Sequence, residues 1–282
     1  MKKVLFSLLI AALSLSAVAQ HKICFSTEAV NNKRATDPNY NQQMQQQEQV
    51  LRKWVNTGTQ DPYYSARVVR TIPVAVHILY NTTAQNVSDA AVQTMINQLN
   101  ADYRKLNSDF STARSVVQAL GADAQIEFCL AQQKPDGSAT NGIEHVFTNE
   151  ACYDVNTETD KMKSSTTGGA NAWNPQKYLN IWIVHLCGSS PQTGGVAGYA
   201  YMPATGNGLH GSSIDGVVID YSIGLGAGNR TWTHEVGHYL GLHHVWGDLS
   251  ANACGNVFPD TDDGFSDTPE SNYTPYGAPN VL

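Results

Sequence analysis

The chain has 282 residues, with 17 lysines and arginines and 24 aspartates and glutamates, so its formal net charge is −7 at pH 7. From Arg67 onward there are 10 basic and 20 acidic residues, a balance of −10. This acidic excess argues against nucleic acid and anionic membrane surfaces as partners. The roughly 215 residues of this part are enough for one domain with a substantial core.

The N-terminus has the pattern of a secretory signal peptide. Two lysines precede an apolar stretch that ends in Ala17-Val18-Ala19, so removal of residues 1–19 is predicted. The apolar stretch is too short to span a membrane, and no cysteine follows it that would carry a lipid anchor. We therefore expect an exported, soluble protein without a membrane anchor.

Residues 20–66 are rich in glutamine and poor in glycine. Their apolar residues recur at roughly helical spacing, which predicts a short helix that packs onto another part of the protein: Tyr40, Met44, Leu51 and Trp54.

Beyond Arg67 the sequence alternates between strands and helices. Strands are predicted at 68–80, 125–131, 178–186, 198–203 and 215–220. Ser88 is predicted to cap a helix with one apolar face, formed by Val92, Met95, Ile96, Leu99, Tyr103 and Leu106. This order predicts an α+β fold in which helices back a twisted sheet.

The most specific motif is HEVGHYLGLHH at residues 234–244, which reads H-E-x-x-H-x-x-G-x-x-H. On a helix, His234 and His238 lie one turn apart on the same face and can bind one Zn²⁺. Glu235 is placed to act as a general base. Gly241 is predicted to end the helix in the left-handed conformation, so that the chain returns His244 as the third ligand. Three protein ligands leave a position for water, as in catalytic zinc sites.

The alternative interpretation of this motif is a histidine-rich surface helix. The neighbouring His243 matches no ligand spacing, so we expect it in a supporting or surface position. The other histidines have no partner at ligand spacing and are expected to be structural: His77, His145, His185 and His210.

The extended motif is the metzincin signature, and its flanks resemble the pappalysin family of metzincin metallopeptidases. The similar segments are IPVAVHILYN, IEFCLA, YLNIWIV, GYAYMP, DGVVID, NRTWTHEVGHYLGLHHVWG and DDGFSDTP, from Ile72 to Pro269. The resemblance implies a metzincin-like catalytic domain with a mixed sheet, over residues 67–282. It also implies a secreted zinc endopeptidase that acts on proteins or peptides.

In such an enzyme zinc polarises the scissile carbonyl, and Glu235 takes a proton from the zinc-bound water and passes it to the leaving amine. The resemblance implies that substrate adds as a strand along the rim at Gly198, Tyr199 and Ala200, as far as Met202. A preference for a basic residue beside the scissile bond is also a property of the family.

Related proenzymes carry a cysteine whose thiolate fills the fourth zinc position. Cys24 lies where such a cysteine is expected, although Phe25 follows it where the family commonly has glycine. Residues 20–66 are then a pro-segment, removed at Ala66–Arg67 or near Arg70. The alternative is a cysteine that pairs elsewhere or stays free.

Two further features are left open by the sequence. Export favours disulfides, but the pairing of Cys129, Cys152, Cys187 and Cys254 is not assigned. A carboxylate cluster is a candidate Ca²⁺ site on the strength of the resemblance, with a solvated acidic turn as the alternative: Asp260, Asp262, Asp263, Asp267 and Thr268.

All five methionines precede the zinc motif, and metzincins carry a methionine turn well beyond it. We therefore expect the lower subdomain to be largely missing from this chain. Three hypotheses follow: a latent secreted zinc endopeptidase, an inactive zinc-binding remnant that binds peptides, or a different zinc hydrolase such as an amidase. The intact Glu235 favours the first.

Overall fold

The computed structural model describes residues 23–57, 68–188, 195–203, 211–226 and 228–245. The predicted signal peptide, the cleavage site at Ala66–Arg67, His210, Cys254 and the carboxylate cluster at 260–268 lie outside these residues. None of the described helices combines the length and apolar character needed to cross a bilayer.

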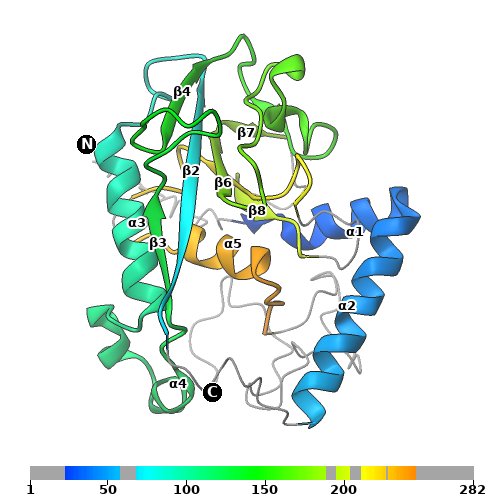
Figure 1. Cartoon of the computed structure of the whole chain (residues 1–282), viewed down its shortest axis with the longest axis vertical. Helices are drawn as coiled ribbons and strands as arrows, with labels where there is room; N and C mark the ends of the chain where they lie inside the picture. Colours follow the sequence, from blue (N-terminus) through cyan, green and yellow to red (C-terminus); the bar gives the residue numbers. More distant parts are fainter. Residues whose placement is uncertain (1–22, 58–67, 189–194, 204–210, 227, 246–282) are drawn as a thin grey trace, which may run out of the picture.

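A seven-stranded sheet forms the centre of the fold (Figure 1). Six of its strands follow the order β1-β8-β9-β6-β2-β3, and the seventh, β4, pairs with β2. Its strands are β1 (Ile23–Cys24), β2 (Arg70–Tyr80), β3 (Ile126–Leu130), β4 (Ile143–Phe147), β6 (Leu179–Val184), β8 (Val196–Ala200) and β9 (Val217–Asp220). The long β2 pairs with β3 along its first half and with β4 along its second half. All pairs of this sheet are parallel except β8 with β9, so the sheet is mixed, as predicted.

One face of the sheet is covered by α3 (Asp89–Tyr103) and α5 (Thr231–Tyr239). Ser88 caps α3, because its side chain accepts a hydrogen bond from the Ala91 N–H. The predicted apolar face of this helix is buried at Val92, Met95, Ile96 and Leu99. The prediction for Leu106 was wrong: α3 ends at Tyr103, Lys105 turns the chain with φ 53°, and Leu106 is exposed.

On the other face of the sheet, a second core combines Tyr153, Val155, Met162 and Ala170 with residues of the N-terminal segment. The N-terminal segment forms two helices instead of the single one predicted, α1 (Ser26–Thr36) and α2 (Pro38–Thr57), drawn in blue in Figure 1. Tyr40 and Met44 are buried, as predicted; the side chains of Leu51 and Trp54 are outside the described set. Five residues of this segment share one hydrophobic core with the sheet: Phe25, Ala29, Val30, Tyr40 and Met44.

The remaining elements are short. They are the helices η2 (Ser108–Thr112), α4 (Ser115–Leu120), η3 (Lys161–Lys163) and η4 (Ser165–Thr167), and the pair β5 (Tyr153–Asp154) and β7 (Leu186–Cys187). A disulfide between Cys152 and Cys187 joins this strand pair. Among the described cysteines, Cys24 and Cys129 are free.

The described histidines outside the zinc motif have structural partners, as expected. His77 is fully buried between Glu144 and Asn180, at 3.0 and 2.9 Å. His145 contacts Asn86 and Asp89, and His185 contacts Asp220.

Candidate metal centre and active site

Helix α5 presents the first two histidines of the motif. Its start is fixed to α3, because Thr233 Oγ1 donates to Asp102 Oδ2 at 2.6 Å and the Tyr103 hydroxyl donates to the Thr233 carbonyl at 3.2 Å. Trp232 and Val236 bury the opposite side of the helix against the sheet. His234 and His238 are thereby held on a helix that packing fixes in position.

Gly241 ends the helix as predicted. It has φ +97°, and its N–H donates to the His238 carbonyl at 2.9 Å, while the Leu242 N–H donates to the Gly237 carbonyl at 2.9 Å. These two bonds form the Schellman motif, in which a left-handed glycine reverses the chain. The reversal returns His244 to the face that carries His234 and His238.

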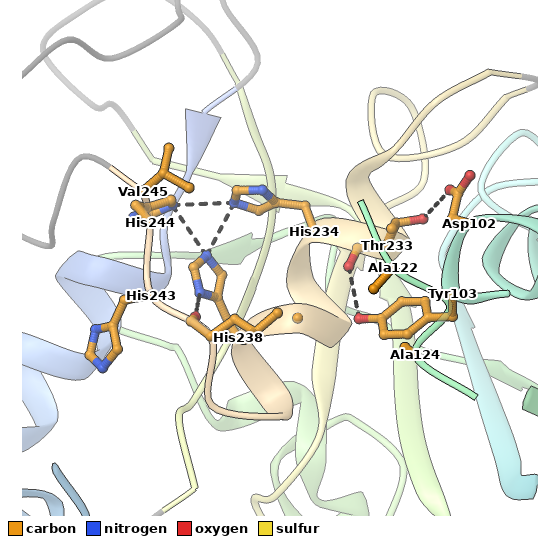
Figure 2. A pocket seen from close by; sticks show the side chains of 12 residues that line it. Asp102, Tyr103, Ala122, Ala124, Thr233, His234, His238, His243, His244 and Val245 are labelled. Atoms are coloured by element: carbon orange, nitrogen blue, oxygen red, sulfur yellow. Dashed lines mark hydrogen bonds between the residues drawn. The ribbon is translucent and has the colours of Figure 1, made fainter. Parts of the chain in front are cut away.

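The three imidazoles converge through their Nε2 atoms, which are 3.1 to 3.2 Å apart (Figure 2). Ligands about 2.05 Å from a tetrahedral zinc lie about 3.3 Å from one another, so the spacing fits zinc. His238 Nδ1 lies 2.7 Å from the Leu242 carbonyl, an acceptor, so this nitrogen carries the proton and Nε2 is left with its lone pair. His243 lies apart from the three rings, as expected (Figure 2).

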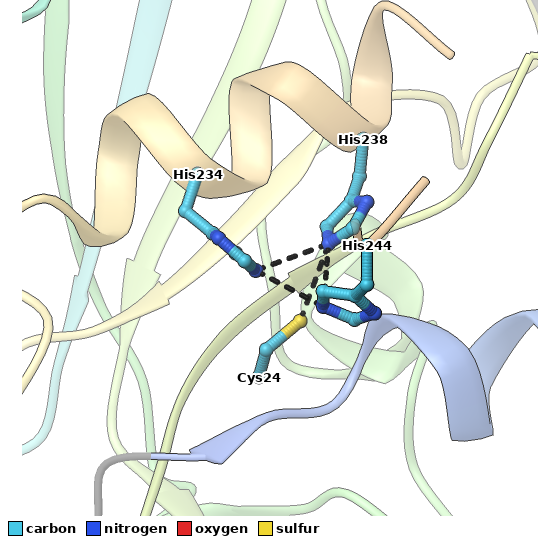
Figure 3. Close-up of side chains that lie close together, drawn as sticks. All are labelled: Cys24, His234, His238 and His244. Atoms are coloured by element: carbon cyan, nitrogen blue, oxygen red, sulfur yellow. Dashed lines mark hydrogen bonds between the residues drawn. The ribbon is translucent and has the colours of Figure 1, made fainter. Parts of the chain in front are cut away.

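Cys24 completes the cluster from the N-terminal segment. Its Sγ is 3.5 Å from His238 Nε2, and the four donor atoms of Cys24, His234, His238 and His244 lie within 4.8 Å of one another (Figure 3). A zinc–sulfur bond of about 2.3 Å in the same tetrahedron predicts a sulfur–nitrogen distance of about 3.6 Å. The observed 3.5 Å between Cys24 Sγ and His238 Nε2 is therefore compatible with the sulfur as a fourth ligand.

The ionisation of these groups also suits a divalent cation. Burial lowers the pKa of His234 to about 4, with His244 acting in the same direction, so His234 is neutral, the form that binds metal. Burial, followed by the charge of Glu235, raises the pKa of the Cys24 thiol well above its ordinary value. A cation among the histidines is the partner that would favour the thiolate.

Glu235 is buried beside the cluster, and burial raises the pKa of its carboxyl to about 7. Its Oε2 accepts a hydrogen bond from the Ser26 hydroxyl at 2.8 Å and lies 3.6 Å from Cys24 Sγ. The same Ser26 oxygen accepts the Ala200 N–H at 2.8 Å. Thr27 Oγ1 lies 3.3 Å from His244 Nδ1. The sequence did not identify Ser26 or Thr27 as site residues; their position two and three residues after Cys24 was the only signal.

The free edge of the predicted rim strand, β8, is paired with the N-terminal segment of the same chain. β1 pairs in parallel with β8, with Cys24 opposite Gly198, and the Phe25 N–H donates to the Gly198 carbonyl at 3.0 Å. Residues 23–25 thus take the edge at which an added strand was expected.

Two hollows flank His234. One, of about 450 Å³, extends from the three histidines past Val245 to Asp102 and Tyr103 (Figure 2). The other, of about 360 Å³, lies beside Cys24 and Glu235 and reaches Arg230. The centre therefore opens to both sides along α5, which leaves room for an extended ligand.

The chain is similar to known proteins in sequence and in fold. Residues 162–278 match a peptidase family described as pregnancy-associated plasma protein-A. A solved structure of mirolysin in complex with a compound is 36% identical, covers 72% of each chain, and superposes with a TM-score of 0.59. The chain belongs to the pappalysin family of metzincins.

A promirolysin mutant of Tannerella forsythia is also similar to this pappalysin. It is 31% identical, with 86% of this chain and 77% of that one covered and a TM-score of 0.66. An extracellular metalloprotease of Arthroderma otae is 24% identical over 68% of this chain and 58% of its own length. An extracellular metalloprotease of Arthroderma benhamiae is 27% identical over 60% of this chain and 51% of its own length. The chain thus spans about half the length of the curated relatives it matches.

Proposed function

We propose that this pappalysin is a secreted, zinc-dependent endopeptidase made as a latent precursor. The observation that carries the proposal is the convergence of Cys24 with His234, His238 and His244, while Glu235 lies beside them. The extracellular relatives support export, and the similarity to promirolysin supports a precursor form. Mature mirolysin, crystallised with a cleaved peptide, supports peptides as the substrate class.

When bound by the three histidines, zinc supplies polarisation of the scissile carbonyl and activation of a water molecule. Glu235 accepts the proton of that water at a carboxylate oxygen and delivers it to the leaving amine. Its burial favours the proton-holding form, so the proton can stay on the carboxyl between the two transfers. The rim at Gly198, Tyr199 and Ala200 supplies backbone groups that hold the substrate as an extended strand.

Latency in this proposal comes from three contacts of the pro-segment. Cys24 takes the position of the water, Ser26 binds Glu235, and β1 covers the edge of β8. Because the pro-segment also contributes five residues to a shared core, cleavage of the chain alone is not expected to release it at once.

The test compares full-length protein with Cys24→Ala and with Cys24→Ala combined with Glu235→Gln. We expect the wild type to bind about one zinc and cleave a denatured protein substrate slowly, and Cys24→Ala to cleave it much faster. The added Glu235→Gln should abolish the gain without loss of zinc. If every variant binds zinc and none cleaves, even after the chain is cut before Arg67 and the pro-segment is removed, the chain is a zinc-binding remnant and the proposal fails.

A further inference from the structure

The two faces of β8 differ in chemistry. Side chains alternate along a strand, so Gly198 and Ala200 face α5, where a Cβ on Gly198 would lie 3.1 Å from Glu235 Cγ. Tyr199 and Tyr201 face the other way, into the core shared with the pro-segment. The rim strand therefore carries two aromatic rings on the face that the pro-segment covers.

The pro-segment places its own rings on these two tyrosines. Phe25 packs edge-to-face on Tyr199, with ring centroids 6.2 Å apart, and Tyr40 packs edge-to-face on Tyr201 at 6.5 Å. The Tyr40 hydroxyl also donates to the Met202 carbonyl at 3.3 Å. All four rings are buried, and Phe25 is only 5% exposed.

The two tyrosines are anchored by residues that do not belong to the pro-segment. The Tyr199 hydroxyl donates to the Thr159 carbonyl. The fully buried Lys163 places its ammonium 4.4 Å from the Tyr201 ring centroid and 5.5 Å from that of Tyr199. Lys163 is itself fixed by the Ile214 carbonyl at 2.9 Å and by Asp160 at 3.2 Å. The rings of Tyr199 and Tyr201 are therefore expected to keep their positions when Phe25 and Tyr40 are removed with the pro-segment.

Phe25 directly follows Cys24, whose sulfur lies at the metal position. We propose that in the processed chain the rings of Tyr199 and Tyr201 form a substrate subsite that takes an aromatic side chain within two residues of the cleaved bond. The inference rests on the proposed peptidase function and adds a substrate preference to it. Burial of the ring favours phenylalanine over alanine by at least about tenfold. Edge-to-face contact adds a further factor of about 2 to 12, which an aliphatic side chain does not gain.

The first test measures binding without catalysis. Full-length protein that carries Glu235→Gln is first allowed to fold. It is then cleaved before Arg67 with an added protease, and the pro-segment is removed. A fluorescent peptide of residues 23–36 is compared with versions carrying Phe25→Leu, Phe25→Ala and Phe25→Asp. We expect the Kd to rise in that order, by at least about tenfold for alanine. Equal Kd values for the four peptides would overturn the proposal.

The second test uses processed wild-type chain and peptide substrates in which one phenylalanine is moved through the three positions on each side of the cleaved bond. A single position within two residues of the bond should raise kcat/KM by about tenfold or more over alanine. Tyr201→Leu should reduce this ratio, whereas Tyr178→Leu, which removes a ring packed on Trp173, should leave it unchanged. A ratio that Tyr201→Leu leaves intact in a folded variant would overturn the assignment.

The two tests separate this inference from the proposed function. Preferential binding of the Phe25 peptide without hydrolysis of any substrate would disprove the peptidase and keep the subsite. Hydrolysis without a preference for phenylalanine, together with equal affinities for the four peptides, would support the peptidase and disprove the subsite. If Tyr201→Leu fails to fold, the affinities of the four peptides for protein with intact Tyr199 and Tyr201 decide whether the subsite exists.

Discussion

The hydroxyl of Ser26 donates a 2.8 Å hydrogen bond to Oε2 of Glu235, 209 residues further along the chain. Both side chains are buried, and the same hydroxyl accepts the Ala200 N–H of the rim strand at 2.8 Å. One side chain of the pro-segment thus binds both the proposed general base and the strand proposed to hold substrate. Latency should therefore depend on Ser26 as well as on Cys24.

We predict that Ser26→Ala raises the basal proteolysis of the full-length chain by about two- to tenfold, because the hydrogen bond that it removes contributes about 0.5–1.5 kcal/mol. Combined with Cys24→Ala, it should give more activity than either change alone. Thr36→Ala is the control, since the Thr36 hydroxyl donates to the carbonyls of Asn32 and Lys33 in its own helix. Unchanged basal activity in both backgrounds would show that Ser26 plays no part in latency.

A methyl group at position 198 should damage the site without removing the metal. A Cβ there would lie 2.8 Å from the Val218 carbonyl oxygen and 3.1 Å from Glu235 Cγ. Gly198→Ala is expected to displace Glu235 and lower kcat by at least about tenfold in activated protein, while zinc content stays the same. Gly195→Ala meets only the flexible end of Ile223, at 3.0 Å, and is the matched control. Equal kcat for both variants would contradict the close approach at Gly198.

The pair formed by the half-buried Glu144 and the buried His77 should make stability depend on pH. The hydrogen bond with His77 is the main cause that lowers the pKa of Glu144 from its ordinary 4.5. A carboxyl with a lowered pKa stabilises the fold above pH 4.5 and loses this contribution as the pH falls through the lowered value. Glu144→Gln should cost about 1.5–3 kcal/mol of unfolding free energy at pH 7.

Denaturant unfolding from pH 7 to pH 3 checks this prediction, with the deficit of Glu144→Gln shrinking as the pH falls. Glu127→Gln, at a more exposed ion pair with Arg104, should cost no more than about 1 kcal/mol. A deficit for Glu144→Gln that is constant across the range would show that its charge does not matter.

The disulfide should support the strand pair β5 and β7. It closes a loop with a sequence separation of 35 between Cys152 and Cys187, and Tyr153 and Val155 next to it are buried in the core shared with the pro-segment. Replacement of both cysteines by serine is expected to lower the unfolding free energy by about 2–4 kcal/mol. Cys129→Ser, at an exposed free cysteine, should change it by less than about 0.5 kcal/mol. Thermal unfolding of the three proteins provides the comparison.

Local spacing was sufficient to predict the metal helix. The positions of His234, His238, Gly241 and His244 follow from helical periodicity and from the conformation that glycine allows. The strands β2 and β6 were predicted because their apolar runs are long, and β3 because IEFCL contains a single charged residue. In contrast, β4 was missed, because IEHVF has the same length as β3 but contains two polar residues.

Contacts between segments that are distant in the sequence could not be predicted from spacing. Cys24 was placed at the metal only through the resemblance to a family, and nothing in the spacing linked Ser26 to Glu235. The burial of Phe25 and Val30 depends on a partner surface formed by strands more than a hundred residues away. The error at Leu106 had a local cause. The left-handed conformation of Lys105 ends the helical path before Leu106, and hydrophobic periodicity does not predict such a turn.

The most direct test of the account replaces zinc by Co²⁺ in the full-length chain and records its near-ultraviolet and visible absorption. A tetrahedral site of three imidazoles and one thiolate should show intense d–d bands and a sulfur-to-cobalt charge-transfer band. Cys24→Ser should abolish the charge-transfer band, and Cys129→Ser should leave it unchanged. Identical spectra for wild type and Cys24→Ser would contradict the claim that Cys24 occupies the fourth metal position.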